Sequence, residues 1–134
     1  MAINFKRLED ITRAMKPVYQ TGKAFHTCFV YYGNRLLAVT HNDYTKLHPY
    51  HKWSVYQPTR EGTKYVSGLH AESRALIKLG LEDCSHLTFI NVRVNNNNQP
   101  AISKPCKNCE RLLRQISIKA IWYYDGEKYV KEKY

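Results

Sequence analysis

Two short stretches of the sequence hold residue types that commonly do metal chemistry. The first contains His70 and Glu72, separated by one residue, and the second is Pro105-Cys106-Lys107-Asn108-Cys109. One imidazole and two thiols are ligands that zinc prefers, and they leave the carboxylate of Glu72 off the metal. A structural zinc site is closed by four protein ligands, whereas three ligands leave a position for water. The two stretches therefore predict one catalytic Zn²⁺ ion.

The chemistry predicted for such a site is hydrolysis. Zinc lowers the pKa of a bound water toward neutrality, and the carboxylate of Glu72 can take the proton. The hydroxide then attacks an electrophilic carbon of the substrate. Glu72 returns the proton to the substrate, where it serves the ring that is attacked and the amine that leaves. The alternative is a structural zinc knuckle at Cys106 and Cys109 beside an incidental His-x-Glu. The catalytic interpretation is favoured because both stretches lie where helices are expected to begin.

The helix starts would position these side chains. Cys106 and Cys109 are spaced to share one face of a helix, with Pro105 in its first turn. The dipole of that helix and the metal both favour the thiolate form. A second helix is expected from about His70 to Leu79. His70 and Glu72 are two positions apart in the first turn of this helix, so their side chains point in different directions. His70 can therefore reach the zinc while Glu72 reaches past it.

His70-Ala71-Glu72 together with Pro105-Cys106-x-x-Cys109 resembles the signature of the zinc-dependent cytidine and deoxycytidylate deaminase superfamily. The resemblance spans about residues 25 to 125. It implies that His70, Cys106 and Cys109 bind the zinc and that Glu72 is the catalytic proton shuttle. It also implies a hydrolase that converts a cytosine base to uracil and releases ammonia.

The resemblance also suggests residues that contact the substrate. An Asn that follows the second strand commonly binds the sugar in this superfamily, so Asn42 takes that role, and its alternative is an ordinary turn residue that ends a strand. Ala71 is assigned to the substrate pocket. The stretch from Asn42 to Pro49 is similar to a pattern in deaminase-like proteins of phages, but Leu47 stands where that pattern has Thr.

A long segment from Tyr44 to Gly68 shows no regular pattern, which is typical of a lid, a binding element or a disordered loop. It interleaves aromatic residues with lysines and arginines, as surfaces do that stack bases and hold phosphates. We therefore expect Tyr44 and Trp53 to contact the substrate. Trp53 could equally anchor the loop.

Periodicity predicts the remaining elements. A helix is expected from Phe5 to near Pro17, because apolar residues recur there at three- and four-residue steps. The expected strands are residues 25–32 and 35–40, which Gly33-Asn34 would join into a hairpin, then residues 86–95 and 118–124. Asp125-Gly126 predicts a second hairpin with a short last strand.

These elements predict an α/β fold, namely the three-layer α/β/α arrangement of cytidine deaminases with a mixed sheet of four to five strands. Too few residues follow Gly126 for a crossover helix, so the C-terminal strand must be antiparallel to its neighbour. That ending resembles the cytidine deaminase branch of the superfamily. At 134 residues, the chain is expected to be a single deaminase domain over residues 1–134.

Charge and cysteine usage limit the partners and the compartment. The net charge of +10 implies anionic partners, although a basic surface can also serve solubility alone. Zinc would claim two of the four cysteines, and Cys28 and Cys84 lie in an apolar strand and after a helix, which fits a reducing cytoplasm. No apolar run approaches membrane-spanning length, so no membrane partner is expected.

Three classes of function compete. The preferred one is an enzyme of nucleotide metabolism that deaminates cytidine, deoxycytidine or their nucleotides. The alternative is a nucleic acid editing enzyme that acts on single-stranded DNA or RNA, which the basic charge and the aromatic loop favour. A zinc-containing binding protein is the third, but binding alone gives no reason for Glu72 beside an open metal position. Homo-oligomers are common in the superfamily and are a further expected partner.

Overall fold

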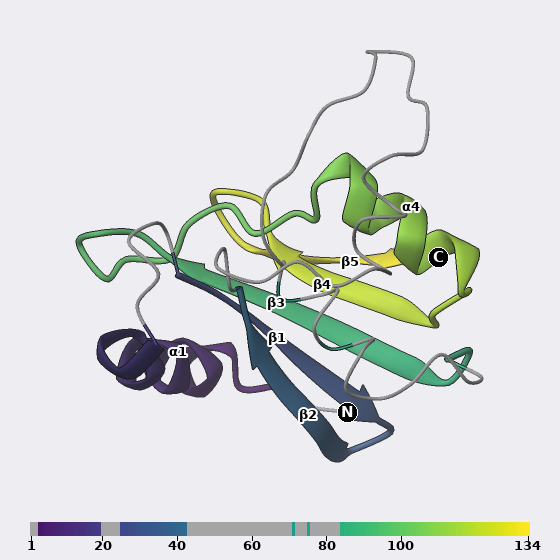
Figure 1. Cartoon of the computed structure of the whole chain (residues 1–134), viewed down its shortest axis with the longest axis horizontal. Helices are drawn as coiled ribbons and strands as arrows, with labels where there is room; N and C mark the ends of the chain where they lie inside the picture. The colour runs from purple at the N-terminus through teal and green to yellow at the C-terminus, as the bar shows by residue number, and fades with distance from the viewer. Residues whose placement is uncertain (1–2, 20–24, 43–70, 72–74, 76–83) are drawn as a thin grey trace.

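The computed structural model describes residues 3–19, 25–42, 71, 75 and 84–134. Five strands form one sheet, and helices lie against it (Figure 1). In chain order the elements are α1 (Phe5–Tyr19), β1 (Phe25–Tyr32), β2 (Arg35–His41), β3 (Leu87–Val94), α4 (Lys107–Gln115), β4 (Ala120–Tyr124) and β5 (Tyr129–Lys133).

The sheet is mixed, with the strand order β2-β1-β3-β4-β5. β3 and β4 pair in parallel, whereas β1 pairs antiparallel with both β2 and β3, and β5 is antiparallel to β4. The prediction of an α/β fold with a mixed sheet is therefore confirmed, as is the antiparallel C-terminal strand. Because β1 lies between β2 and β3, its Cys28 is in register with Thr40 of β2 on one side and with Asn91 of β3 on the other.

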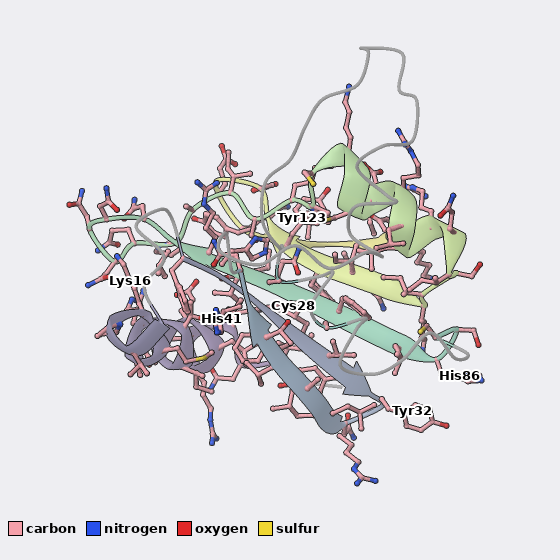
Figure 2. The ribbon with its side chains drawn as sticks, viewed as in Figure 1. Lys16, Cys28, Tyr32, His41, His86 and Tyr123 are labelled. Carbon is pink, nitrogen blue, oxygen red and sulfur yellow. The ribbon has the colours of Figure 1, made fainter. Side chains whose placement is uncertain are left out.

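The two faces of the sheet pack against different helices (Figure 1). On one face, Leu8 of α1 packs in a cluster with Phe29, Ile90 and Val92. On the other face, Leu112 and Leu113 of α4 belong to a larger cluster that also holds Ala71 and Ala75. The side chains therefore alternate between two separate cores along each central strand. Figure 2 shows Cys28 near the middle of the sheet and Tyr123 toward α4.

The first helix is longer than the sequence predicted. It was expected to end near Pro17, but Pro17 lies inside its last turn and the helix continues to Tyr19. A proline this close to the C-terminal end removes only one helical hydrogen bond. The last turn is also held from outside, because the buried Lys16 ammonium donates to the carbonyl oxygen of Asn95 at 2.9 Å and to Oδ1 of Asn98 at 3.1 Å.

Both predicted hairpins form, but the second turn is longer than the pair Asp125-Gly126, because Tyr124 pairs with Tyr129 and four residues lie between them. Gly33 has a φ of +58°, as the tight turn between β1 and β2 requires. In the second turn Asp125 closes the loop, since its backbone N–H donates to the carbonyl oxygen of Lys128 at 3.0 Å. The Asp125 carboxylate accepts backbone hydrogen bonds from Lys128 and Glu127, which hold its pKa below the usual value.

The two strands predicted before and after the cysteines begin later than expected. β3 starts at Leu87, and β4 starts at Ala120, whereas a strand from residue 118 was expected. Ile118 is fully buried but lies in the connection that follows α4. Neither of the helices described in residues 3–19 and 84–134 is long and apolar enough to cross a membrane.

Candidate functional site

Cys106 and Cys109 lie together at the start of α4. Cys106 is the N-cap residue, and its Sγ accepts a hydrogen bond from the backbone N–H of Cys109 at 3.5 Å. Cys109 is buried and Cys106 is partly exposed. The expectation that Pro105 would lie in the first turn was wrong, because Pro105 precedes the N-cap and is buried outside the helix. Both thiols nevertheless belong to one helix start, as the spacing predicted.

A buried hydroxyl group fixes the chain just before this helix. Ser103 Oγ donates to the carbonyl oxygen of Asn91 at 2.9 Å and accepts the backbone N–H of Tyr124 at 2.8 Å. The Asn91 side-chain amide donates in turn to the carbonyl oxygen of Ser103 at 3.2 Å. Ser103 therefore ties the segment that leads to Cys106 to both parallel strands, β3 and β4.

We expect Ser103→Ala to lower the free energy of unfolding by about 2 kcal/mol, because it leaves a buried backbone N–H and a buried carbonyl oxygen without this partner. Urea unfolding followed by circular dichroism measures the change. Thr88→Ala is a matched control, since it removes a hydroxyl from β3 at a half-buried position. A loss for Ser103→Ala no greater than the control's would contradict the anchoring role.

A second hydroxyl group holds Ala71, the middle residue of the His-x-Glu motif. Thr40 Oγ1, buried on β2, donates to the carbonyl oxygen of Ala71 at 2.6 Å. Ala71 has helical backbone geometry, as does Ala75, and both are fully buried in the core on the α4 side of the sheet. Ala71 stands between His70 and Glu72 in the sequence, and this bond holds Ala71 to β2.

The two anchors lie at the same level of the sheet. Thr40 and Asn91 are both register partners of Cys28 on the strand between them. Neighbouring strands are separated by about 4.8 Å, so the two anchoring residues are about 10 Å apart. Both act on the face of the sheet that packs against α4, because Cys28, Ala71 and Leu112 share that core. Ala71 and Ser103, which are distant in the sequence, are thus held in one region of the fold.

Asn42 follows β2 and is almost fully buried. Its backbone N–H donates to the carbonyl oxygen of His26 at 3.0 Å, and its Oδ1 accepts the backbone N–H of His26 at 3.1 Å. Asn42 therefore completes the pairing of β1 with β2, as the strand-ending alternative predicted. The proposed contact between Asn42 and a sugar stays a prediction.

The other end of α4 is held by charged and aromatic groups. Arg114 forms ion pairs with Glu110 at 3.1 Å and with Glu132 of β5 at 3.6 Å, and its guanidinium lies 4.1 Å from the centre of the Tyr134 ring. A hydrogen bond to Glu132, followed by burial and the negative charge of that carboxylate, raises the pKa of Tyr123 to about 12. These contacts fix α4 to the C-terminal hairpin at the end opposite the cysteines.

Four predicted site residues, namely His70, Glu72, Tyr44 and Trp53, lie outside the described residues, as does the segment from Tyr44 to Gly68. Within residues 3–19, 25–42 and 84–134 and at positions 71 and 75, no cluster of three metal-binding side chains occurs. That part of the chain holds two of the three predicted zinc ligands, so the predicted ligand set is neither assembled nor contradicted by it.

Sequence reasoning did not identify Thr40, Asn91 and Ser103 as parts of the site. A signal for the first two was present, because alternation along β2 and β3 places Thr40 and Asn91 on the face that also carries the apolar Ala38 and Phe89. Polar residues on a buried face require hydrogen-bond partners. No pattern in the sequence identifies which partners these are.

Comparison of the chain with models of known families, with curated proteins and with solved structures finds no match.

Proposed function

We propose that this protein is a zinc-dependent deaminase that hydrolyses the exocyclic amine from the cytosine base of a nucleoside or nucleotide, within a cytidine-deaminase-like fold. The observation that carries the proposal is the pair of anchors on either side of Cys28. Thr40 holds Ala71, and Asn91 with Ser103 holds the chain that leads to Cys106. Ala71, the middle residue of the His-x-Glu motif, and Cys109 of the Pro-Cys-x-x-Cys motif therefore lie on the same face of the sheet.

The donor set in this region fits a zinc ion. Cys106 and Cys109 lie at one helix start, and neither forms a disulfide. His70, the third proposed ligand, precedes the anchored Ala71 directly. Two thiolates and one imidazole are borderline-soft ligands that suit zinc and leave a coordination position open. When bound, the ion would supply Lewis acidity that activates water near neutral pH.

The protein's own groups have separate roles in this proposal. Glu72 accepts one proton of the attacking water and delivers it to the ring nitrogen. It then moves the second proton, from the hydroxyl group added at C4, to the amine, which leaves as ammonia while the C4 carbonyl forms. Asn42 binds the sugar, and the backbone at Ala71 borders the base. Tyr44 and Trp53 contact the substrate from the segment that follows β2. The buried hydroxyl groups of Thr40 and Ser103 hold the backbone and do not contact the substrate.

Ammonia release by the purified, zinc-supplemented protein tests this function. Cytidine, deoxycytidine, their monophosphates and a cytosine-containing single-stranded oligonucleotide are offered in parallel, with adenosine as the control for base specificity. We expect release from at least one of the four monomers and none from adenosine. Absence of release from every cytosine substrate would refute the proposed reaction.

The second candidate is deamination of cytosine in single-stranded DNA or RNA. It is favoured by the net charge of +10 and by the aromatic and basic residues that alternate in the sequence between Tyr44 and Gly68. In the same assay, release of ammonia from the oligonucleotide alone would establish this candidate and exclude the monomers as substrates.

The proposed location is the cytoplasm. None of the four cysteines forms a disulfide, and three of them are buried. Cysteines that do not form disulfides are typical of proteins in a reducing compartment. A homo-oligomer, as is common in the superfamily that the sequence resembles, is also proposed.

A further inference from the structure

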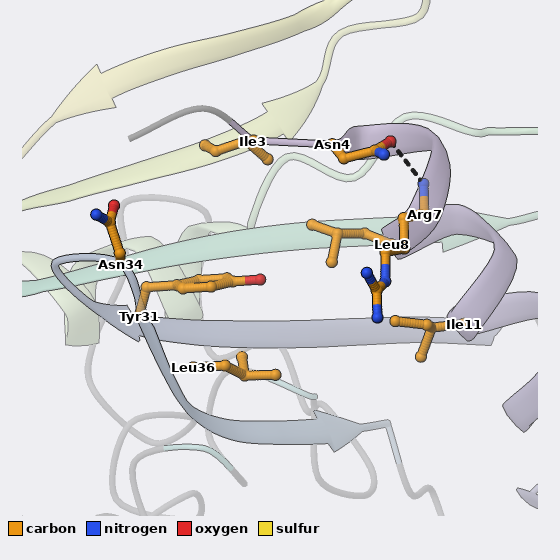
Figure 3. Close-up of a pocket in the computed structure, with 8 residues that line it drawn as sticks. All are labelled: Ile3, Asn4, Arg7, Leu8, Ile11, Tyr31, Asn34 and Leu36. Atoms are coloured by element: carbon orange, nitrogen blue, oxygen red, sulfur yellow. Dashed lines mark hydrogen bonds between the residues drawn. The ribbon is translucent and has the colours of Figure 1, made fainter.

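Two hollows adjoin on the face of the sheet that packs against α1, which is the face opposite the cysteines. The larger has a volume of about 510 Å³ and lies between α1 and the strands β1 and β2 (Figure 3). The smaller, of about 260 Å³, crosses β3, β4 and β5. Ile3 and Asn34 line both hollows, which therefore adjoin and are together called the α1-face groove. Its charged lining residues are Arg7, Lys119 and Lys131, and its aromatic lining residues are Tyr31 and Trp122.

The floor of the α1-face groove is a row of side chains from neighbouring strands. Tyr31 of β1 lies in register with Leu36 of β2 on one side and with Thr88 of β3 on the other. Trp122 of β4 extends the same face and is partly exposed, with Phe5 packed beside it at 5.4 Å between ring centres. Figure 3 shows the Tyr31 ring lying along the floor while Arg7 projects toward it from α1. The groove thus holds two aromatic rings, of which Trp122 also has the Lys131 ammonium 5.8 Å from its ring centre.

The charged groups of the groove all have the same sign. Arg7, Lys119 and Lys131 are exposed, and none forms an ion pair with another described residue. The described lining contains no Asp or Glu. Lys133 is the register partner of Ala120 and shares the face of Lys131, so it adds a fourth positive charge at the end of β5. The groove therefore suits a partner that carries several negative charges along its length.

We propose that the α1-face groove binds single-stranded nucleic acid. Bases stack on Tyr31 and Trp122, and the phosphates between them are held by Arg7, Lys119 and Lys131. Aromatic rings alternating with cations along an open groove are the arrangement that single strands require, because every base has a flat face and every linkage has a charge. An acidic peptide would match the charges but would provide no flat rings for Tyr31 and Trp122.

This inference does not rest on the proposed deamination. The groove and the cysteines lie on opposite faces of the sheet, so a bound strand is anchored away from the proposed zinc site. A strand of thymidines contains no cytosine, and its binding therefore reports on the groove whether or not the protein is a deaminase.

The test is fluorescence anisotropy of a labelled fifteen-nucleotide oligothymidylate titrated with the full-length protein across a series of salt concentrations. Each phosphate contact to a single strand contributes about −0.7 to the slope of log K against log salt, so three contacts predict a slope of about −2. Absence of measurable binding at low salt would overturn the proposal.

Two matched double variants separate the groove from the general charge of the protein. Lys119→Gln/Lys131→Gln removes two cations of the groove, and Lys104→Gln/Lys128→Gln removes two exposed cations elsewhere. We expect the first to weaken binding about tenfold and to reduce the slope by about 1.4, and the second to change the affinity less than about twofold. Equal losses in the two variants, or a larger loss in the second, would overturn the assignment.

A pair of substitutions at Tyr31 tests the stacking contribution. Tyr31→Phe keeps the aromatic ring and is expected to bind as the wild type does, whereas Tyr31→Leu keeps the apolar packing and is expected to bind about tenfold more weakly. Circular dichroism confirms that each variant is folded before its affinity is compared. Equal affinity of the Leu and Phe variants would exclude stacking on Tyr31.

Discussion

Glu72→Ala lowers the rate of cytosine deamination by a factor of about 10² to 10⁴ or more, because the proposed reaction loses the group that moves its proton. The variant keeps one bound zinc, since Glu72 is assigned beside the metal and not as a ligand of it. Ammonia release measures the first effect, and metal analysis of the purified variant measures the second. Loss of activity with retained metal separates a proton shuttle from a zinc ligand.

The matched control for this experiment is Glu127→Ala, which removes a carboxylate from the exposed turn between β4 and β5. It should leave both the rate and the metal content unchanged. Two results would count against the proposed role of Glu72. Activity close to that of the wild type would exclude it as the proton shuttle, and a loss of zinc would make it a ligand.

Cys109→Ala removes a proposed zinc ligand and should lose metal and stability together. Metal binding and folding are linked, because the unfolded chain has no preformed site. We expect less than one zinc per chain and a melting temperature that no longer depends on zinc or on a chelator. In the wild type, a zinc concentration of 100 times the dissociation constant adds about 2.7 kcal/mol to the stability.

Cys84→Ala is the control, because Cys84 is as deeply buried as Cys109 but lies outside the proposed site. It loses only core packing and should keep one zinc and the response to chelator. An unchanged zinc content in Cys109→Ala would refute the ligand assignment. Equal metal loss in both variants would show that the effect comes from the damaged core.

The sequence predicted those parts of the fold that depend on interactions between residues close together in the chain. The hairpin between β1 and β2 follows from Gly33-Asn34 between two apolar runs, and the antiparallel β5 follows from the few residues left after Gly126. The predicted end of α1 was two residues too early, and the contacts that hold the last turn come from distant groups. Lys16 bonds to the turn at Asn95 and Asn98, and no pattern near Pro17 indicates that contact.

Local spacing was also enough at the candidate site, where Cys106 and Cys109 lie together at one helix start as predicted.

The turn at residues 95–98, outside the candidate site, shows the opposite case. Consecutive asparagines indicate a turn but do not indicate which element the turn contacts. Asn98 has a φ of +59°, and its carbonyl oxygen accepts a hydrogen bond from Nε of Arg13 at 2.7 Å, so the turn holds α1 to the sheet.

By itself the sequence predicted the described strands and helices and the alternation of their side chains, and it supplied the proposed zinc ligands and proton shuttle. These depend on residue types at short spacing, whose effects act within a few turns or a single hairpin. Of the helix expected from His70 to Leu79, only Ala71 and Ala75 lie within the described residues. Only the tertiary structure decided that Thr40 and Asn91 flank Cys28 and that Arg7, Lys119 and Lys131 share one groove. Strand order and register bring those residues together, and they arise from packing across the whole sheet rather than from any local pattern.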